Sequence, residues 1–306
     1  MRYYFAPMEG LTDGVYRRMH HKFFGGVDRY YMPFISPTVH RTLTPKESRE
    51  LPPADSVPFT AIPQIMSKVP EDAIWAAEQC AQRGYQEVNL NLGCPSGTVV
   101  AKGKGAGMLR DTDNLKRFLD GVYAASLPIS IKTRLGLESS EEFPAILDIY
   151  NQYPIQELTI HPRTRKQFYN GQLHLEMFRY AVENSKNPLC FNGDLTSPED
   201  IQRIADQYPQ VKAVMLGRGL VRDPGMLTSQ GTTIDALAAF HDALFEEYSV
   251  VFDNARNAMT RLKESWHYLE LRFEENPKIF KRLRKATDVA EFRSIATEIF
   301  QTQKLL

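Results

Sequence analysis

The feature that most constrains the fold of this chain is a regular alternation of short apolar runs with longer amphipathic stretches. Apolar runs of about four to eight residues are typical of strands that are buried on both faces of a parallel sheet. The stretches between them carry helix-starting signals, such as proline and acidic residues at Pro70, Glu71 and Asp72. We expect eight strands, at residues 3–8, 29–34, 59–66, 87–92, 129–133, 157–160, 189–192 and 213–217.

Eight strands that alternate with helices predict an α/β fold, a (β/α)8 or TIM barrel, over residues 1–233. A doubly wound open sheet is the alternative, but the sequence has no early G-x-G-x-x-G motif to favour it. The strand pattern stops near Ile234, and apolar residues such as Phe240 and Leu244 then recur at helical spacing. We therefore expect a small all-helical C-terminal domain over residues 234–306.

The composition excludes several classes of protein. Lysine plus arginine and aspartate plus glutamate both number 37, so a protein that coats nucleic acid nonspecifically is disfavoured, although a local basic patch is not. No apolar run approaches the roughly 20 residues needed to span a bilayer, and Pro7 and Glu9 come too early for a secretory signal. The 3 cysteines are too few for a disulfide framework. We expect a cytoplasmic protein that does not associate with membranes.

Polar and glycine residues gather where the expected strands end. In a (β/α)8 barrel these ends meet at one rim, where the active sites of such folds lie. A polar ligand site at this rim is therefore the favoured interpretation. The residues lie at 6–10, Gln64, 89–95, 132–136, 161–164, 192–194 and 217–219.

The end of the eighth expected strand has the composition of a phosphate site. Glycines at Gly217 and Gly219 let the backbone approach an anion closely, and Arg218 supplies a planar, two-pronged donor. The loops after the last two strands commonly bind phosphate in this fold, so Asn192 and Asp194 would complete the site. The alternative is a tight turn with a surface arginine.

Two further rim residues carry chemistry. Lys132 lies within the expected strand at 129–133, and a lysine in a barrel strand is costly to bury unless it meets an anion or an electron-rich acceptor. His161 directly follows the sixth expected strand. The alternative for Lys132 is a surface charge that reaches solvent at the strand end. The alternative for His161 is a histidine that only forms ordinary hydrogen bonds and has no role in catalysis.

Cys94 lies between Gly93 and Pro95 on the loop after the fourth expected strand. A thiol held there is accessible, and it could act as a nucleophile, as a general acid or not at all. The glycine-rich run at 103–107 lacks the G-K-[ST] ending of a P-loop, so we expect a mobile loop over the site. The 7 histidines do not cluster at ligand spacing, so we expect no metal.

Five basic residues crowd into residues 278–285 of the helical tail. The two interpretations are a solvated helix face and a patch that contacts phosphates. The residues are Lys278, Lys281, Arg282, Arg284 and Lys285.

Taken together, these segments resemble the tRNA-dihydrouridine synthase family of flavoproteins. The resemblance runs from Ala6 to Gly219 and is carried by the joint occurrence of Asn-x-Gly-Cys-Pro at 91–95, Lys-x-Arg-x-Gly at 132–136, the strand-end histidine, Asn-Gly-Asp and Gly-Arg-Gly. The tail, in particular residues 261–269, is more loosely similar to the tRNA-binding tail of bacterial members.

The resemblance implies FMN at the barrel mouth, reduced by NADPH, with hydride passing to C6 of a tRNA uridine that has been extruded from its stack. It implies that Cys94 is the acid that protonates C5. It implies binding of the uracil and its nucleotide by Asn91, Arg134 and Arg163, and of tRNA phosphates by Lys281, Arg282 and Arg284. We expect tRNA as the partner and a monomeric enzyme. The residues implied to hold FMN are Pro7, Met8, Glu9, Gln64, Lys132, His161, Asn192, Gly193, Asp194, Gly217 and Arg218.

Two other functions remain as alternatives. One is an FMN barrel oxidoreductase that acts on a free small molecule such as dihydroorotate, although that class has no need of a helical tail. The other is a tRNA-binding or folding module whose catalysis has lapsed, against which the intact Cys94, Lys132 and His161 argue.

Overall fold

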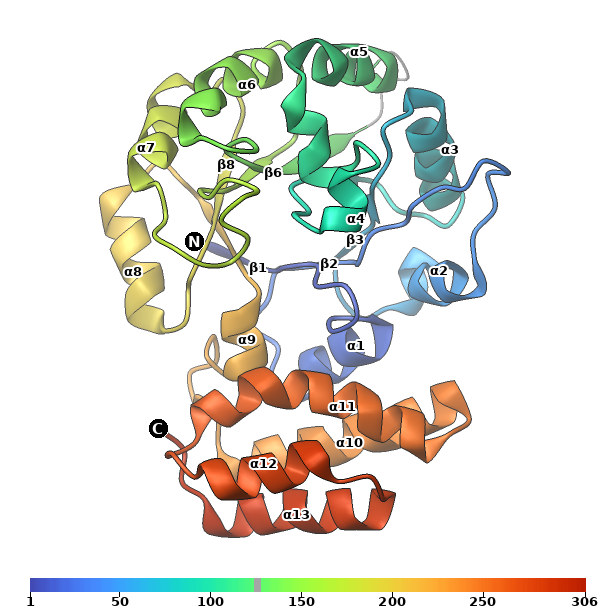
Figure 1. Cartoon of the computed structure of the whole chain (residues 1–306), viewed down its shortest axis with the longest axis vertical. Coiled ribbons are helices and arrows are strands. Elements are labelled where there is room, and N and C mark those ends of the chain that lie inside the picture. The colour runs from blue at the N-terminus through green and yellow to red at the C-terminus, as the bar shows by residue number, and fades with distance from the viewer. Residues whose placement is uncertain (124–127) are drawn as a thin grey trace. The chain divides into compact units, whose positions relative to one another are not determined.

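The computed structural model of the protein describes residues 1–123 and 128–306, and it contains one sheet of parallel strands with helices around it (Figure 1). The strand order is β3-β2-β1-β9-β8-β7-β6-β5-β4. The two outermost strands in this order are halves of one run, interrupted at Pro63, so the sheet closes on itself and the predicted (β/α)8 barrel is confirmed. The strands are β1 (Arg2–Phe5), β2 (Arg29–Tyr31), β3 (Ala61–Ile62), β4 (Gln64–Ile65), β5 (Val88–Leu92), β6 (Ile129–Arg134), β7 (Leu158–His161), β8 (Leu189–Asn192) and β9 (Ala213–Leu216).

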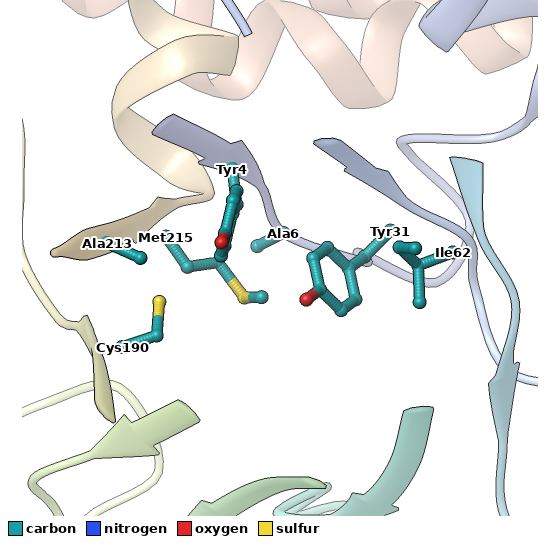
Figure 2. Packing of buried hydrophobic residues seen from close by; sticks show 7 residues of the cluster. All are labelled: Tyr4, Ala6, Tyr31, Ile62, Cys190, Ala213 and Met215. Atoms are coloured by element: carbon teal, nitrogen blue, oxygen red, sulfur yellow. The ribbon is translucent and has the colours of Figure 1, made fainter. Parts of the chain in front are cut away.

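The interior of the barrel is filled by side chains that alternate along the strands. Tyr4 and Ala6 come from the first strand and the residues after it, and they meet side chains from the other strands (Figure 2). All members of this cluster are at most 5% exposed. Tyr4 and Ala6, two residues apart, share the inner face because successive strand residues point to opposite faces of the sheet. The remaining members are Tyr31, Ile62, Cys190, Ala213 and Met215.

Local signals in the sequence explain where the outer helices begin. The helix α3 (Pro70–Ala81) starts with proline at its first position and has two acids in its first turn. The short helix α2 (Pro45–Glu50) is held by a capping box between Thr44 and Glu47. Helices after the later strands cover the outside of the barrel (Figure 1). They and the short turns are η1 (Ala54–Ser56), α4 (Gly97–Val100), η2 (Gly105–Arg110), α5 (Thr112–Tyr123), η3 (Ser140–Glu142), α6 (Phe143–Tyr150), α7 (Leu175–Asn184) and α8 (Pro198–Gln207).

The contacts within the chain divide it into two compact units. One holds the strands, with Met1–Pro7, Asp28–Gly193 and Ile201–Met215. The other holds Met8–Val27, Asp194–Asp200 and Leu216–Leu306. The second unit contains α1 (Gly14–Phe23), α9 (Arg218–Arg222), α10 (Ile234–Phe252), α11 (Ala255–Leu269), η4 (Glu270–Arg272), α12 (Pro277–Lys285) and α13 (Val289–Thr302).

The second unit has a core of its own. Trp266 is fully buried and packs against Phe273 and Phe280, which come from the segments that follow α11. Asp13 caps α1 by accepting from the Tyr16 backbone N–H, and it also accepts a 2.8 Å hydrogen bond from the Tyr248 hydroxyl on α10. These contacts join α1 to the C-terminal helices, and the predicted all-helical character of the tail is confirmed. In the part of the chain that the structure describes, none of the helices combines the length and the apolar character that crossing a membrane requires.

Candidate active site

A chain of amide hydrogen bonds joins β4, β5 and the loop after β5. Gln64 Nε2 donates to Asn89 Oδ1 at 2.8 Å, and Asn91 Nδ2 donates to Gln64 Oε1 at 2.8 Å. Asn91 Oδ1 in turn accepts from the backbone N–H groups of Gly93, at 3.2 Å, and Cys94, at 2.9 Å. Asn91, held in turn by the buried Gln64, therefore fixes the turn that presents Cys94.

Cys94 is partly exposed, and its backbone is held from a second side. Its carbonyl accepts from the backbone N–H of Ala106 at 3.0 Å. Gly105 has a left-handed φ of 56°, and a Cβ there would lie 2.9 Å from both the Cβ and the carbonyl oxygen of Cys94. Residues 105–109 are buried in the η2 turn. The prediction of a mobile loop is therefore wrong for this segment. Gly105 is needed for close packing against Cys94, whereas the glycine-rich sequence had suggested a flexible loop.

Gly105→Ala is expected to destabilise the protein by about 2–4 kcal/mol, since it combines backbone strain with overpacking against Cys94. The matched control is Gly103→Ala, which has a similar φ of 69° but a nearest neighbour 3.7 Å away, at Lys68 Cδ. The control should cost only about 1 kcal/mol. Urea unfolding of both variants measures the difference, and equal losses would contradict the packing argument.

Lys132 lies on β6, and it is half-buried. Burial, with the nearby Arg134 charge, lowers the pKa of its amine to about 8. Cys94 and Cys190 are close enough to influence that pKa. Among residues 1–123 and 128–306, the structure gives this amine no hydrogen bond or ion pair, so it is a cation placed to meet an acceptor that the protein itself does not supply.

Arg134, at the end of β6, is 2% exposed and joins two loops. Its guanidinium donates to the carbonyls of Gly93, on the loop after β5, and of Thr164 and Phe168, on the loop after β7. Burial lowers its pKa to about 10. The predicted substrate residue is thus also a buried connection between the Cys94 loop and its neighbour.

His161 and Arg163 form a buried pair at the end of β7. Arg163 Nη1 lies 3.2 Å from His161 Nε2. Arginine can only donate, so Nε2 accepts and the imidazole carries its proton on Nδ1. Arg163 also donates through Nε and Nη2 to the carbonyl of Gly171, which closes the loop after β7.

The same loop carries two aromatic residues that the sequence reasoning missed. Tyr169 is 51% exposed, its ring centroid lies 6.2 Å from that of His161, and the Arg134 guanidinium lies 5.1 Å from the ring centroid. Phe168 is 41% exposed. The signal that could have identified them is a pair of adjacent aromatic residues in an otherwise polar loop directly after a strand-end histidine.

The residues of the predicted phosphate site are placed as follows. Asn192 Nδ2 donates to the Met215 carbonyl at 2.8 Å and so joins the ends of β8 and β9. In the second unit, Arg218 Nη2 lies 2.7 Å from Asp194 Oδ1, and both side chains are more than a third exposed. A Cβ at Gly219 would fall 2.0 Å from the Leu195 carbonyl oxygen, so glycine is required there. Gly193 and Gly217 lie in the turns that carry these side chains.

The residues that follow β1 form a tight turn. The backbone N–H of Met8 donates to Thr12 Oγ1 at 2.8 Å, and the Met8 carbonyl accepts from the N–H groups of Leu11 and Thr12. Pro7 and Met8 are half-buried, whereas Glu9 is exposed. Across residues 1–123 and 128–306, no group of three or more His, Cys, Asp and Glu is arranged to hold a metal ion.

The basic cluster of the tail lies on α12, whose apolar face is buried. Arg282 pairs with Glu298 at 3.2 Å, and Arg284 pairs with Glu270. The other three cations share one helix face and are exposed, with no ion pair within the described part of the chain. These are Lys278, Lys281 and Lys285.

Comparison with known proteins places the chain in a family. The family model "Dihydrouridine synthase (Dus)" matches residues 4–306, and the protein belongs to this family. The tRNA-dihydrouridine synthase B of Pasteurella multocida (strain Pm70) is 29% identical over 236 residues, which cover 76% of this chain and 70% of that protein. A probable tRNA-dihydrouridine synthase of Staphylococcus aureus (strain COL) is 30% identical over 234 residues, with coverages of 72% and 68%.

Solved structures support the barrel fold. Morphinone reductase has a TM-score of 0.52 at 12% identity, over 74% of this chain and 84% of that one. The old yellow enzyme homologue of Zymomonas mobilis also has a TM-score of 0.52 at 12% identity, with coverages of 73% and 86%. These similarities concern the fold alone.

Proposed function

We propose that this protein reduces specific uridines of tRNA to 5,6-dihydrouridine, with FMN as its cofactor and NADPH as the reductant. The observation that carries the proposal is the presentation of Cys94, in a chain of the dihydrouridine synthase family, on a hydrogen-bonded turn beside Lys132, to which residues 1–123 and 128–306 supply no partner. When bound, reduced FMN supplies the hydride for C6 of the uracil. The protein acts in the cytoplasm.

The residues present fit a flavin phosphate and ring. Lys132 is a half-buried cation to which the described part of the chain gives no anionic partner, and an electron-rich ring edge would relieve its desolvation. Arg218 is oriented by Asp194 yet remains more than a third exposed, so its guanidinium can also face a phosphate. Gln64, His161, Asn192 and the turns at 7–9, 193 and 217 would complete the cofactor contacts.

The protein supplies the proton. Cys94 donates it to C5 of the uracil, and this requires a protonated thiol at a fixed position. Asn91 fixes that position through the Cys94 N–H, and the second hydrogen of its Nδ2 can donate to a uracil carbonyl. Arg134 and Arg163 hold the flanking loops. Because Arg163 donates a hydrogen bond to Nε2 of His161, that nitrogen carries no proton that it could give to the uracil.

A uracil within folded tRNA must leave its stack to reach the rim, at a cost of a few kcal/mol that binding elsewhere has to offset. The exposed cations of α12 offer such binding energy to phosphates. Because Arg284 is paired with Glu270 and Arg282 with Glu298, the contact falls mainly on the exposed Lys278, Lys281 and Lys285.

Replacing Lys278, Lys281 and Lys285 together with glutamine is expected to flatten the dependence of log Kd for tRNA on log[salt] by about two to three units, roughly one counterion per phosphate contact. Filter binding at several salt concentrations measures the slope. Arg284→Gln, whose charge is already paired, is the control and should change the slope by less than about half a unit. If the triple variant keeps the original slope, α12 is only a solvated face.

Lys132 gives the protein a distinct pH dependence of stability. The folded protein releases this proton near pH 8, whereas the unfolded chain holds it to about 10.5. The free energy of unfolding of the flavin-free protein should therefore rise between these pH values, relative to Lys132→Met, by as much as about 3 kcal/mol. Urea unfolding of both proteins at pH 7, 8.5 and 10 measures this, and a difference that does not change with pH would contradict it.

A strain that lacks the gene tests the proposal in the cell. Its tRNA should lose dihydrouridine at defined positions, which mass mapping of tRNA fragments identifies. Intact dihydrouridine at every position, combined with turnover of dihydroorotate by the purified protein, would favour the small-molecule alternative instead.

A further inference from the structure

Two neighbouring aromatic side chains stand out on the surface. Phe168 and Tyr169 are 41% and 51% exposed, and no other aromatic side chain in residues 1–123 and 128–306 is as exposed. Both lie on the loop after β7, at the rim that carries Cys94 and His161. Isolated apolar residues on a surface are ordinary, but two adjacent exposed aromatics beside a nucleotide site call for a physical account.

The loop that carries them is rigid. Arg134 donates to the Phe168 carbonyl, and Arg163 donates to the Gly171 carbonyl. Gln167 braces the loop from within, because its Oε1 accepts from the Thr164 N–H at 2.9 Å and its Nε2 donates to the Gln172 carbonyl at 3.2 Å. The exposed rings are therefore held in fixed positions, as a preformed binding surface requires.

The backbone at Phe168 is strained. Its φ is 51°, in the left-handed region where a bulky residue costs about 1–2 kcal/mol relative to glycine. The ring gains little burial in return, because 41% of the residue is exposed. A strained position that displays an apolar ring to solvent is explained by a function of that ring rather than by folding.

Arg165 connects Phe168 to the Cys94 loop. Its guanidinium carbon lies 5.0 Å from the Phe168 ring centroid, and its Nε donates at 3.2 Å to the carbonyl of Pro95, the residue after Cys94. Its Nη2 also lies 3.8 Å from where a Cβ of Gly97 would stand. An aromatic face next to a guanidinium is the combination on which unpaired nucleobases stack.

We propose that Phe168 and Arg165 form a stacking platform for the unpaired base next to the uridine that is reduced. This inference rests on the proposed function, since extruding a uridine unstacks its neighbours and leaves a base with an uncovered face. Phe168 covers that face, and the Arg165 charge faces the adjoining phosphodiester. Binding of this flanking base offsets part of the energy needed to extrude the uridine.

The first test compares Phe168→Gly with Phe168→Trp. Glycine suits the left-handed backbone, so the melting temperature should not fall, while kcat/KM for tRNA should drop roughly 5- to 100-fold through the loss of one stacked base. The tryptophan variant should retain kcat/KM within about threefold, because it restores an aromatic face. Val39→Gly, which removes a 93% exposed apolar side chain from another loop, is the matched control and should leave kcat/KM unchanged.

The second test identifies the occupant. Once the reduced uridine has been mapped, synthetic tRNAs with an abasic site on its 5′ or 3′ side are assayed with the wild type and Phe168→Gly. One of these substrates should lower the wild-type kcat/KM to the level of the variant, and the variant should lose nothing further. If both abasic tRNAs preserve the full difference between the two proteins, the platform does not bind a flanking base.

The outcomes separate this inference from the proposed function. If the wild type forms no dihydrouridine, the proposed function itself fails. If the wild type is active and Phe168→Gly equals it, only the platform is refuted. A slower reduction of the flavin by NADPH in Phe168→Gly would instead mean that the ring serves the nicotinamide nucleotide, and this would also overturn the proposal.

Discussion

Cys94→Ala is expected to slow the reoxidation of the reduced flavin by tRNA roughly 10²–10⁴-fold, the usual contribution of a positioned general acid. In the proposed mechanism, hydride arriving at C6 leaves negative charge at C5, and the thiol of Cys94 supplies the proton that completes the reduction. The cysteine is partly exposed and its N–H is fixed by Asn91, so it has the access and the rigidity that this role requires.

Stopped-flow measurement of the two half-reactions isolates this effect. Flavin content, tRNA affinity and reduction by NADPH should stay within about twofold of the wild type, because none of them uses the proton. Cys80→Ala serves as the control, since that cysteine is fully buried on α3. Reoxidation by tRNA at the wild-type rate in Cys94→Ala would show that another group, or solvent, supplies the proton.

Arg218→Ala is expected to weaken FMN binding roughly 10- to 100-fold, because it would remove the proposed charge-assisted contact to the phosphate and leave the Asp194 carboxylate without its arginine. Fluorescence titration of the flavin-free protein with FMN measures the change directly, and the purified variant should also contain less flavin. Unchanged affinity would refute the phosphate assignment.

Two variants refine this test. Arg222→Ala removes a second arginine from the same helix, α9, and should leave FMN affinity unchanged. Asp194→Asn keeps a residue type that tolerates the φ of 44° at this position but removes the charge that orients Arg218, so it should weaken binding by less than Arg218→Ala does. An equal effect of all three variants would point to a general disturbance of the second unit.

The barrel could be predicted because its strands are buried on both faces and so form apolar runs between helix signals. The expected strand at 189–192 has the bounds of β8, and 213–217 differs from β9 by one residue. The expected strand at 59–66 is instead two short halves, since Pro63 has no N–H to offer a neighbouring strand. The alternation of residue types shows where a strand lies but not where its hydrogen bonds stop.

The candidate site could be predicted in position but not in detail. Motif residues such as Cys94 and Lys132 fall on strand ends, and the fold brings strand ends together. The bonds of Arg134 and Asn91 to backbone carbonyls and N–H groups depend on how loops from different strands pack, and spacing in the sequence does not encode that. Phe168 escaped notice for the same reason, since its exposure and its left-handed backbone exist only in the folded loop.

The proposed function is tested most directly by an assay of the purified protein with NADPH and tRNA transcripts that contain no modified bases, followed by digestion and mass spectrometry of the nucleosides. We expect a yellow protein that forms dihydrouridine in tRNA but not from free uridine, at a rate that falls by the expected factor in Cys94→Ala. A flavin-loaded wild-type protein that oxidises NADPH yet leaves every uridine of tRNA unreduced would contradict the proposed function.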